Sequence, residues 1–471
     1  MSVSKALRAA LGGDCAVIDD EQILKSYERD QAPFAPSAKA AAVLIAKSVD
    51  EVSKAVKFAN QESIPVVIRG AGSGLAGGAN SIQGCIVISL EKLNKILEID
   101  QTNQIARVEA GVINSDLDKA AEEFGLTYLP DPASRSWSTI GGNIATNAGG
   151  MCCVKYGVTA QHVRAIKVVL SDGEIVEFGF PTKKAVTTLD LLHLFIGSEG
   201  TLGVVVEATL SLVPRLKKPV TLIATFPSIT KAADAAIEML IVRPSMLELI
   251  DKTTLSAVEE WKPMGFENCE AVLIMQSDES AIDCQRAQEI ALKHGALDAI
   301  YSDDPKDSDD LIQVRKLAYS SLERLGVALL DDVAVPVSKI SQLVSGVESI
   351  AKKHSVKVGV FGHAGDGNLH PTCLTDERDS KALDITQKAG IESVFNKIKP
   401  DFCINTAAYT AVDKAETETE KAEAINVTGV RNLAEVCKEF KTQLIHVSTD
   451  FVFDGTKKTP YTEEDIPNPK S

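Results

Sequence analysis

The sequence predicts an α+β protein of several domains, and three observations support this fold class. Two glycine-rich segments, residues 66–78 and 138–150, lie among short apolar runs typical of strands. Strands and helices then alternate from about residue 216, and the sequence changes character again near residue 383. We therefore expect an N-terminal helical segment (1–35), a first domain (36–215), a second, α+β domain (216–382) and a partial parallel α/β unit (383–471).

Composition and charge narrow the class of protein. The 471 residues are 45% hydrophobic and 24% charged, which is enough apolar material for a large core. A net charge of −16 argues against nucleic acid or an anionic membrane surface as a partner. Nine cysteines without metal-ligand spacing indicate a reduced, cytoplasmic compartment. No apolar run reaches eighteen residues, so we expect no transmembrane segment.

The first glycine-rich segment reads V-V-I-R-G-A-G-S-G-L-A-G-G from Val66 to Gly78. Before it, the spacing of Val52, Val56 and Ala59 predicts a helix over Val49–Asn60, and Pro65–Arg69 reads as a strand. Closely spaced glycines let backbone N–H groups converge on an anion, here a cofactor pyrophosphate. The spacing matches neither the dinucleotide fingerprint nor a P-loop. The alternative interpretation is a mobile surface loop.

The second glycine-rich segment follows a helix predicted over Ser115–Phe124. It begins with L-P-D-P-A-S, which contains Pro130, Asp131 and Ser134, and continues as S-T-I-G-G-N-I-A-T-N-A-G-G from Ser138 to Gly150. Its glycines offer backbone donors, and its hydroxyl and amide side chains offer further contacts. Two such loops suggest one long cofactor held from both sides. The alternative is a tight turn whose glycines serve packing.

Three further motifs complete the first domain, and together they carry a resemblance. These are K-Y-G at 155–157, a hairpin turning at 171–173, and G-S-E-G-T-L-G-V-V at 197–205. With the two glycine-rich segments they resemble the PCMH-type FAD-binding domain of the vanillyl-alcohol-oxidase-type flavoproteins. Within these, the chain is most similar to the glycolate oxidase flavin subunit and the D-lactate and D-2-hydroxyglutarate dehydrogenases.

The resemblance implies bound FAD, with the pyrophosphate at Gly70–Gly74 and along Thr139–Thr146. Some members attach FAD through a histidine in the first loop, and this loop has none, so we expect a non-covalent flavin. The residues assigned to FAD on this basis are Arg69, Gly70, Ala71, Gly72, Ser73, Gly74, Leu75, Pro130, Asp131, Ser134, Thr139, Gly141, Gly142, Asn143, Ala145, Thr146, Tyr156, Gly203 and Val204.

The second domain contains two features that carry chemistry. Arg315 lies in L-I-Q-V-R-K-L on a predicted helix, and its planar guanidinium suits a carboxylate. His363 and His370 lie in F-G-H-A-G-D-G-N-L-H-P, where glycines permit a bend that brings both rings to one site. Two imidazoles can ligate a divalent metal, and one can act as a base. A structural role for either histidine alone is the alternative.

The resemblance assigns roles to these residues. It implies that Arg315 holds the substrate carboxylate and that His363 and His370 ligate a divalent metal (Zn, Mn or Fe). If no metal binds, we expect His370 to act as the catalytic base. The family's G-E-H-G run, which completes the metal site, is absent here, so we expect an incomplete ligand set. Leu329 and Leu330 stand where a basic residue would favour a dicarboxylate, which favours a monocarboxylate substrate.

From about residue 383 the chain resembles part of dTDP-4-dehydrorhamnose reductase, an extended short-chain dehydrogenase with a Rossmann-like fold. The motifs are I-N-T-A-A-Y-T-A-V-D, A-I-N-V-T-G-V-R-N-L-A-E-V-C and L-I-H-V-S-T-D-F-V-F-D-G-T. The resemblance places Asp384 and residues 406–408 along a nicotinamide cofactor, and Ser448 and Thr449 near the substrate. The family's phosphate loop and Tyr-x-x-x-Lys pair are absent. We therefore expect no reductase activity and a junction near residues 381–384.

Together these observations predict an FAD-dependent dehydrogenase that oxidises a 2-hydroxy acid of the D-lactate or glycolate type. The expected partners are this small substrate and an electron-acceptor protein or quinone, which would also allow peripheral membrane association. Two alternatives stay open: a chimeric protein that binds FAD without turnover, and an NADPH-dependent sugar-nucleotide reductase acting through the last 89 residues.

Overall fold

The chain forms two compact units. The computed structural model describes residues 2–12, 15–32, 35–187, 189–377, 385–405, 418–447 and 456–457. The first unit comprises Met1–Leu322 with Ala328–Thr375, and the second comprises Glu323–Val327 with Asp376–Ser471. Pro33, Asp384, residues 406–408, Ser448, Thr449 and the predicted junction at 381–384 lie outside the described residues.

The first domain begins with a four-stranded sheet ordered β1-β2-β4-β3. Its strands are β1 (Ala16–Ile18), β2 (Ala42–Ile45), β4 (Ile86–Ser89) and the edge strand β3 (Val66–Arg69), with β2, β4 and β3 parallel. Helices α1 (Val3–Leu11) and α3 (Val49–Gln61) pack on it through Leu7, Leu11 and Val52, and α2 (Glu21–Ser26) follows β1. The predicted helix and strand before the glycine loop are therefore confirmed.

An antiparallel five-stranded sheet completes this domain, ordered β5-β6-β10-β8-β9. Its strands are β5 (Ile96–Asp100), β6 (Ile105–Glu109), β8 (Val163–Val169), β9 (Ile175–Gly179) and β10 (Val204–Ser211). The shorter elements around it are α4 (Asn114–Glu122), β7 (Leu126–Thr127), α5 (Ile140–Thr146), α6 (Cys153–Tyr156), η1 (Thr159–His162), α7 (Leu192–Phe195) and β11 (Val213–Pro214). The predicted hairpin at 171–173 joins β8 to β9.

Five charged side chains cross this sheet in a ladder of alternating sign, one from each strand. Arg107 lies 3.9 Å from Glu98 and 3.8 Å from Glu207. Lys167 lies 2.7 Å from Glu207 and 3.5 Å from Glu177.

The second domain is built on one sheet ordered β15-β12-β14-β13-β18-β19-β16, with β17 also pairing with β19. The strands are β12 (Val220–Phe226), β13 (Met246–Asp251), β14 (Ala271–Ser277), β15 (Asp298–Ser302), β16 (Gly326–Leu330), β17 (Val333–Ala334), β18 (Lys357–His363) and β19 (Asn368–Glu377). The helices are α8 (Ile229–Met239), η2 (Leu240–Val242), α9 (Lys252–Trp261), α10 (Ala281–Lys293), α11 (Pro305–Leu311), α12 (Gln313–Leu325), η3 (Val337–Lys339) and α13 (Ile340–His354).

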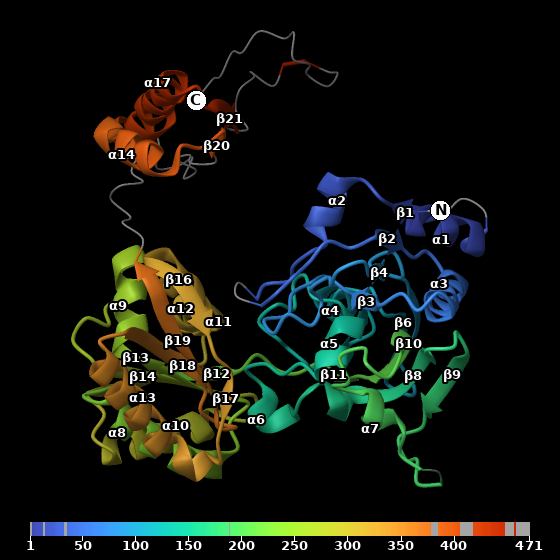
Figure 1. Ribbon diagram of the computed structural model, residues 1–471. Coiled ribbons are helices and arrows are strands. Elements are labelled where there is room, and N and C mark those ends of the chain that lie inside the picture. The colour runs from blue at the N-terminus through green and yellow to red at the C-terminus, as the bar shows by residue number, and fades with distance from the viewer. Residues whose placement is uncertain are drawn as a thin grey trace. The chain divides into compact units, whose positions relative to one another are not determined.

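Helices cover both faces of this sheet (Figure 1). On one face α8, α10 and α13 bury an apolar core with Leu247 and Leu249 of β13. On the other face α9 and α12 pack against β18, where Leu322 and Thr254 approach Gly359 so closely that a Cβ there would lie 2.7 Å from each. This second face carries the polar residues described below.

The second unit has a two-stranded parallel sheet, β20 (Phe402–Asn405) with β21 (Gln443–His446). Helices α14 (Lys388–Ile398) and α17 (Val430–Phe440) form its core through Phe395, Leu433 and Val436. Helix α16 (Thr419–Glu423) and the turn η4 (Ala424–Gly429) precede α17. Among the described residues, none of the helices is long and apolar enough to cross a bilayer.

Candidate active site

The first glycine-rich segment leaves the end of the edge strand β3 as an open loop. Gly72 has φ +72°, a conformation that side chains rarely adopt, and the Arg69 guanidinium occupies the space where its Cβ would lie. Arg69 is buried beneath the loop, with Nη2 donating to the carbonyl of Arg29 at 2.9 Å and Nη1 to that of Ala79 at 3.3 Å. Arg69 therefore supports the loop from below.

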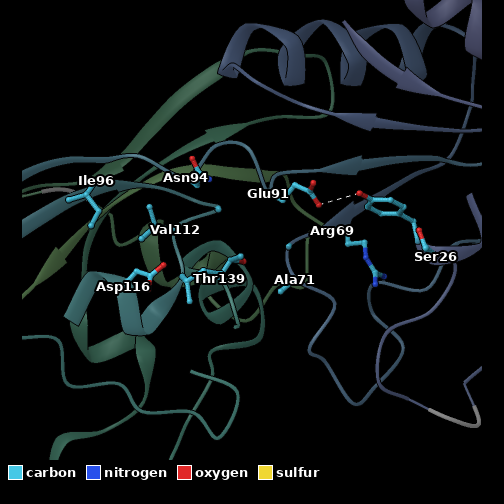
Figure 2. A pocket seen from close by; sticks show the side chains of 13 residues that line it. Ser26, Arg69, Ala71, Glu91, Asn94, Ile96, Val112, Asp116 and Thr139 are labelled. Carbon is cyan, nitrogen blue, oxygen red and sulfur yellow. Dashed lines mark hydrogen bonds between the residues drawn. The ribbon is translucent and has the colours of Figure 1, made fainter. Parts of the chain in front are cut away.

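A cavity of about 530 Å³ opens beside this loop. Figure 2 shows Arg69 and Ala71 on one wall and Thr139 with Val112 on the other. Gly70 is the point of closest approach, since a Cβ there would lie 2.4 Å from Thr139 Oγ1. Sequence reasoning thus placed Arg69, Gly70, Ala71 and Thr139 on one cavity. It missed the remaining lining residues, which are Ser26, Tyr27, Glu91, Asn94, Ile96, Gly111, Val112, Ile113 and Asp116.

The cavity fits a dinucleotide cofactor such as FAD at its glycine edge. The backbone amides of Gly70–Gly74 donate no hydrogen bond to any part of the chain that the structure describes, so they are free for phosphate oxygens. Glu91 accepts a hydrogen bond from Tyr27 at 3.2 Å, and Asp116 lines the cavity beside Thr139 (Figure 2). These carboxylates suit the hydroxyl and amino donors of a nucleoside better than phosphate.

The second glycine-rich segment differs from the loop predicted for it, because residues 140–146 form helix α5. Thr139 is its N-cap and accepts from the amide of Gly142 at 3.2 Å. The amides of Ile140 and Gly141 donate to the carbonyls of Val112 and Ala110 at 2.8 and 2.7 Å. The predicted supply of free backbone donors is therefore wrong at these positions. Gly141 instead lets α5 pack closely on Ala110, because a Cβ at position 141 would lie 2.6 Å from the Ala110 Cβ.

Four other assigned residues of α5 and its neighbours make contacts within the chain. Asn143 is buried, accepts from Asn114 Nδ2 at 3.0 Å and donates to Ser138 Oγ at 3.2 Å. Thr146 Oγ1 donates to the carbonyl of Gly142, and the carbonyl of Ala145 accepts from the Glu199 amide. These residues shape the wall through packing, and their role toward FAD stays a prediction.

The remaining assigned residues lie outside the cavity lining. Leu75 is half exposed, and neither Ser73 nor Gly74 lines the cavity. Gly203 packs against Val168 and Val169 of β8, and Val204 is buried in the core. Neither contacts the cavity, so the structure gives both a packing role.

Tyr156 connects the two domains. Its hydroxyl donates to the carboxylate of Asp278 in the second domain, and Lys155 Nζ lies 2.5 Å from the other oxygen of that carboxylate. Lys155 also contacts Glu279 at 2.8 Å. Tyr156, which was assigned to the cofactor, and Lys155 thus hold the first domain to the residues that follow β14.

A second polar cluster lies on the face of β13, β18 and β19 that α12 covers. Glu248 of β13 is fully buried, and its register pairs it with His363 of β18. Its Oε2 accepts from Arg315 Nε of α12, and its Oε1 lies 2.6 Å from His363 Nδ1. The Arg315 guanidinium also lies over the Phe361 ring, 5.0 Å from its centroid. Glu248 therefore contacts both Arg315 and His363, which the sequence analysis identified separately.

The two histidines lie together because their segment is a hairpin. Phe361 pairs with His370 and His363 with Asn368, so both histidines share one face, and Gly367 at φ +84° makes the turn. Their ring centroids are 5.0 Å apart and nearly perpendicular. His370 Nδ1 lies 3.3 Å from Asp332 Oδ1, a contact that is an ion pair only when the imidazole is protonated.

The histidines do not complete a metal site within the described residues, where no three His, Cys, Asp or Glu side chains are placed to share an ion. The incomplete ligand set expected from the sequence stays a prediction. The pair alone remains a candidate for two of the ligands.

Burial and the ionic contacts shift several pKa values here. Burial raises the pKa of Asp131 to about 6, although the Cys152 amide and His363 oppose this. Burial would also raise the pKa of Glu248, but His363 and Arg315 outweigh it and hold it at about 2. Burial lowers the pKa of His363, but the neighbouring Glu248 carboxylate outweighs burial, so the pKa of His363 is raised. Glu248 is therefore a carboxylate at neutral pH.

Sequence reasoning missed Glu248, although a signal was present. It is the central residue of M-L-E-L-I-D, and a charged residue inside an apolar run that forms a fully buried strand needs a partner. The partners, Arg315 and His363, are 67 and 115 residues away. No local pattern could have named them.

Comparisons with known proteins agree with this organisation. A model described as FAD binding domain matches residues 40–179, and one described as FAD linked oxidases, C-terminal domain, matches residues 215–398. A third, RmlD substrate binding domain, matches residues 365–471.

Two curated relatives and two solved structures illustrate the likeness. Glycolate oxidase subunit GlcD of Bacillus subtilis is 38% identical over 364 residues, covering 76% of this chain and 77% of the relative. D-lactate dehydrogenase of Anaerostipes hadrus is 37% identical over 382 residues, covering 78% and 80%. p-Cresol methylhydroxylase shares the fold with a TM-score of 0.64 at 17% identity (79% and 82% covered), as does a 4-ethylphenol oxidase from Gulosibacter chungangensis with 0.63 at 17% (80% and 82%).

Proposed function

Because the chain belongs to the FAD-linked oxidases, a family of FAD-dependent oxidoreductases, we propose that it oxidises a 2-hydroxy acid of the D-lactate or glycolate type to the 2-oxo acid. The observation that carries this proposal is the set of contacts that Arg315 makes. Its Nε is held by Glu248, and its terminal nitrogens donate no hydrogen bond to any described residue. A buried guanidinium with two free donors on one edge is suited to a substrate carboxylate.

The neighbouring side chains supply the rest of the site. Bound, non-covalent FAD supplies the hydride acceptor. Arg315 fixes the carboxylate end of the substrate, which sets the position of the α-carbon. When no metal is bound, His370 accepts the hydroxyl proton, and Asp332 beside it stabilises the resulting imidazolium. His363 and His370 would hold a divalent metal if further ligands come from outside the described residues.

The test is anaerobic reduction of the FAD-loaded chain by D-lactate, glycolate and D-2-hydroxyglutarate, followed as loss of the oxidised flavin absorbance. Bleaching by a monocarboxylate supports the proposal, and stronger bleaching by D-2-hydroxyglutarate would move the substrate to a dicarboxylate. A yellow protein that dithionite reduces, and none of the three acids does, would select the alternative of a protein that binds FAD without turnover.

The electron acceptor and the compartment follow from the same proposal. We expect a cytoplasmic protein that passes electrons to a partner protein or a quinone. Reoxidation of the substrate-reduced protein by a soluble quinone, compared with dioxygen at equal concentration, separates a dehydrogenase from an oxidase.

A further inference from the structure

Glu248 is an unusual residue to place in a sheet core. It is fully buried on β13, with the buried Leu247 and Leu249 on either side facing the opposite surface of the sheet. A buried ion pair gives little net stability compared with apolar side chains of similar volume, because desolvation offsets the attraction. Stability alone therefore does not account for this carboxylate.

The geometry gives Glu248 a different task, because each of its two oxygens holds one residue of the site. Oε2 accepts from Arg315 Nε, which leaves the terminal guanidinium nitrogens as the donors that remain. Oε1 lies 2.6 Å from His363 Nδ1, which fixes the ring and leaves Nε2 as its free nitrogen.

The residues held by Glu248 are in turn in contact with the rest of the site. The Arg315 guanidinium lies over Phe361, and the His370 ring lies 5.5 Å from Phe361 and 5.0 Å from His363. Arg315 comes from α12 and the histidines from the β18–β19 hairpin, so Glu248 is the link between two elements that approach from different parts of the chain.

We propose that Glu248 is a positioning residue: one buried carboxylate sets both the carboxylate-binding edge of Arg315 and the orientation of His363. This inference rests on the proposed function for the identity of the substrate. It goes beyond it in naming the residue that couples substrate anchoring to the histidine pair. Removing an outer-shell partner of a metal-binding residue typically costs about 10- to 100-fold in metal affinity or activity, and we expect a loss of this order here.

The test uses the full-length, FAD-loaded chain and oxamate, a monocarboxylate of lactate size without an oxidisable hydroxyl. Oxamate binding is read from the change in flavin absorbance, so it does not depend on turnover. Glu248→Gln retains the shape but presents an amide N–H to one of the two donors. We expect it to weaken oxamate binding about 10- to 100-fold, with FAD content per chain unchanged.

Two further variants separate positioning from folding. Glu248→Asp retains the buried charge but is one methylene shorter and cannot reach both partners, so it should also lose oxamate affinity even if the Gln variant does not fold. Leu249→Ala removes packing from the opposite face of the same strand. It should lower the melting temperature while leaving the oxamate Kd within about twofold of the parent.

The outcomes are distinct. Oxamate binding that survives in both Glu248 variants, or that falls equally in Leu249→Ala at the same loss of melting temperature, overturns the inference. A parent chain that does not bind oxamate overturns it too. A parent that binds oxamate, loses this in the Glu248 variants and yet oxidises no hydroxy acid leaves the inference standing and refutes the proposed activity.

Discussion

Replacing Gly70 with alanine should weaken FAD binding by crowding the closest approach in the cofactor cavity. A Cβ at this position lies 2.4 Å from Thr139 Oγ1, and the next atoms, Thr139 Cβ and Gly142 Cα, are at 3.7 and 3.8 Å. The clash is therefore with a single hydroxyl oxygen, and that hydroxyl has to move.

The cost of this movement can be worked out from the contact that Thr139 makes. Its Oγ1 accepts from the Gly142 amide at 3.2 Å and caps α5. Losing such a cap costs about 1 kcal/mol, with an upper limit of about 2 kcal/mol. If FAD binding has to restore this arrangement, its Kd rises by about 5- to 30-fold.

The assay is titration of the apoprotein with FAD, followed by flavin fluorescence, in a double-mutant cycle. Thr139→Ala removes the obstructing oxygen, so Gly70→Ala should add little to the loss in Thr139→Ala alone. Gly346→Ala on α13, where a Cβ meets nothing within 4 Å, is the matched control and should bind FAD as the parent does. Additive losses in the cycle, or normal binding by Gly70→Ala, would refute the reasoning.

Three further predictions concern the second domain and the last residues. Arg315→Lys should raise the KM for the hydroxy acid about 10-fold or more, because an ammonium cannot bind Glu248 and the substrate along two edges. Arg286→Lys, at an exposed position of α10, should leave the KM unchanged, and steady-state kinetics measure both. Asp251 has its pKa raised by burial from 3.8 to about 6, so it binds its proton more tightly when folded and the parent loses stability as pH rises from about 4 to about 6. Asp251→Asn should remove that loss. Measured by urea unfolding, the free energy of unfolding of this variant should rise relative to that of the parent by up to about 3 kcal/mol between about pH 4 and pH 7. A difference between the two proteins that does not change with pH contradicts the pKa shift. Removing residues 383–471 should leave FAD binding intact, and calorimetry of the full chain with NADPH should give no heat of binding; a tail-dependent NADPH signal would instead support the reductase alternative.

The sequence predicted best where a local pattern determines local structure. Apolar spacing was enough for α3, and the glycines between His363 and His370 indicated the bend that brings the rings together. It failed at residues 140–146, where two glycines and an asparagine lower helix propensity and yet α5 forms, because Thr139 caps it and Gly141 fits against Ala110. Glu248 could not be identified from the sequence for another reason. Its role depends on Arg315 and His363, and only the tertiary structure brings these two residues into contact with it.

The charge ladder on the five-stranded sheet has a consequence for how the first domain assembles. Strands β6 and β10 are neighbours in space but distant in the chain, and such pairings form slowly. A slip of one residue would move the charged side chains of the slipped strand to the opposite face of the sheet and break their ion pairs. Dissolved ions mask these attractions. Ionic strength should therefore affect the fraction of refolding chains that reach the native strand register far more than it affects the stability of the folded protein.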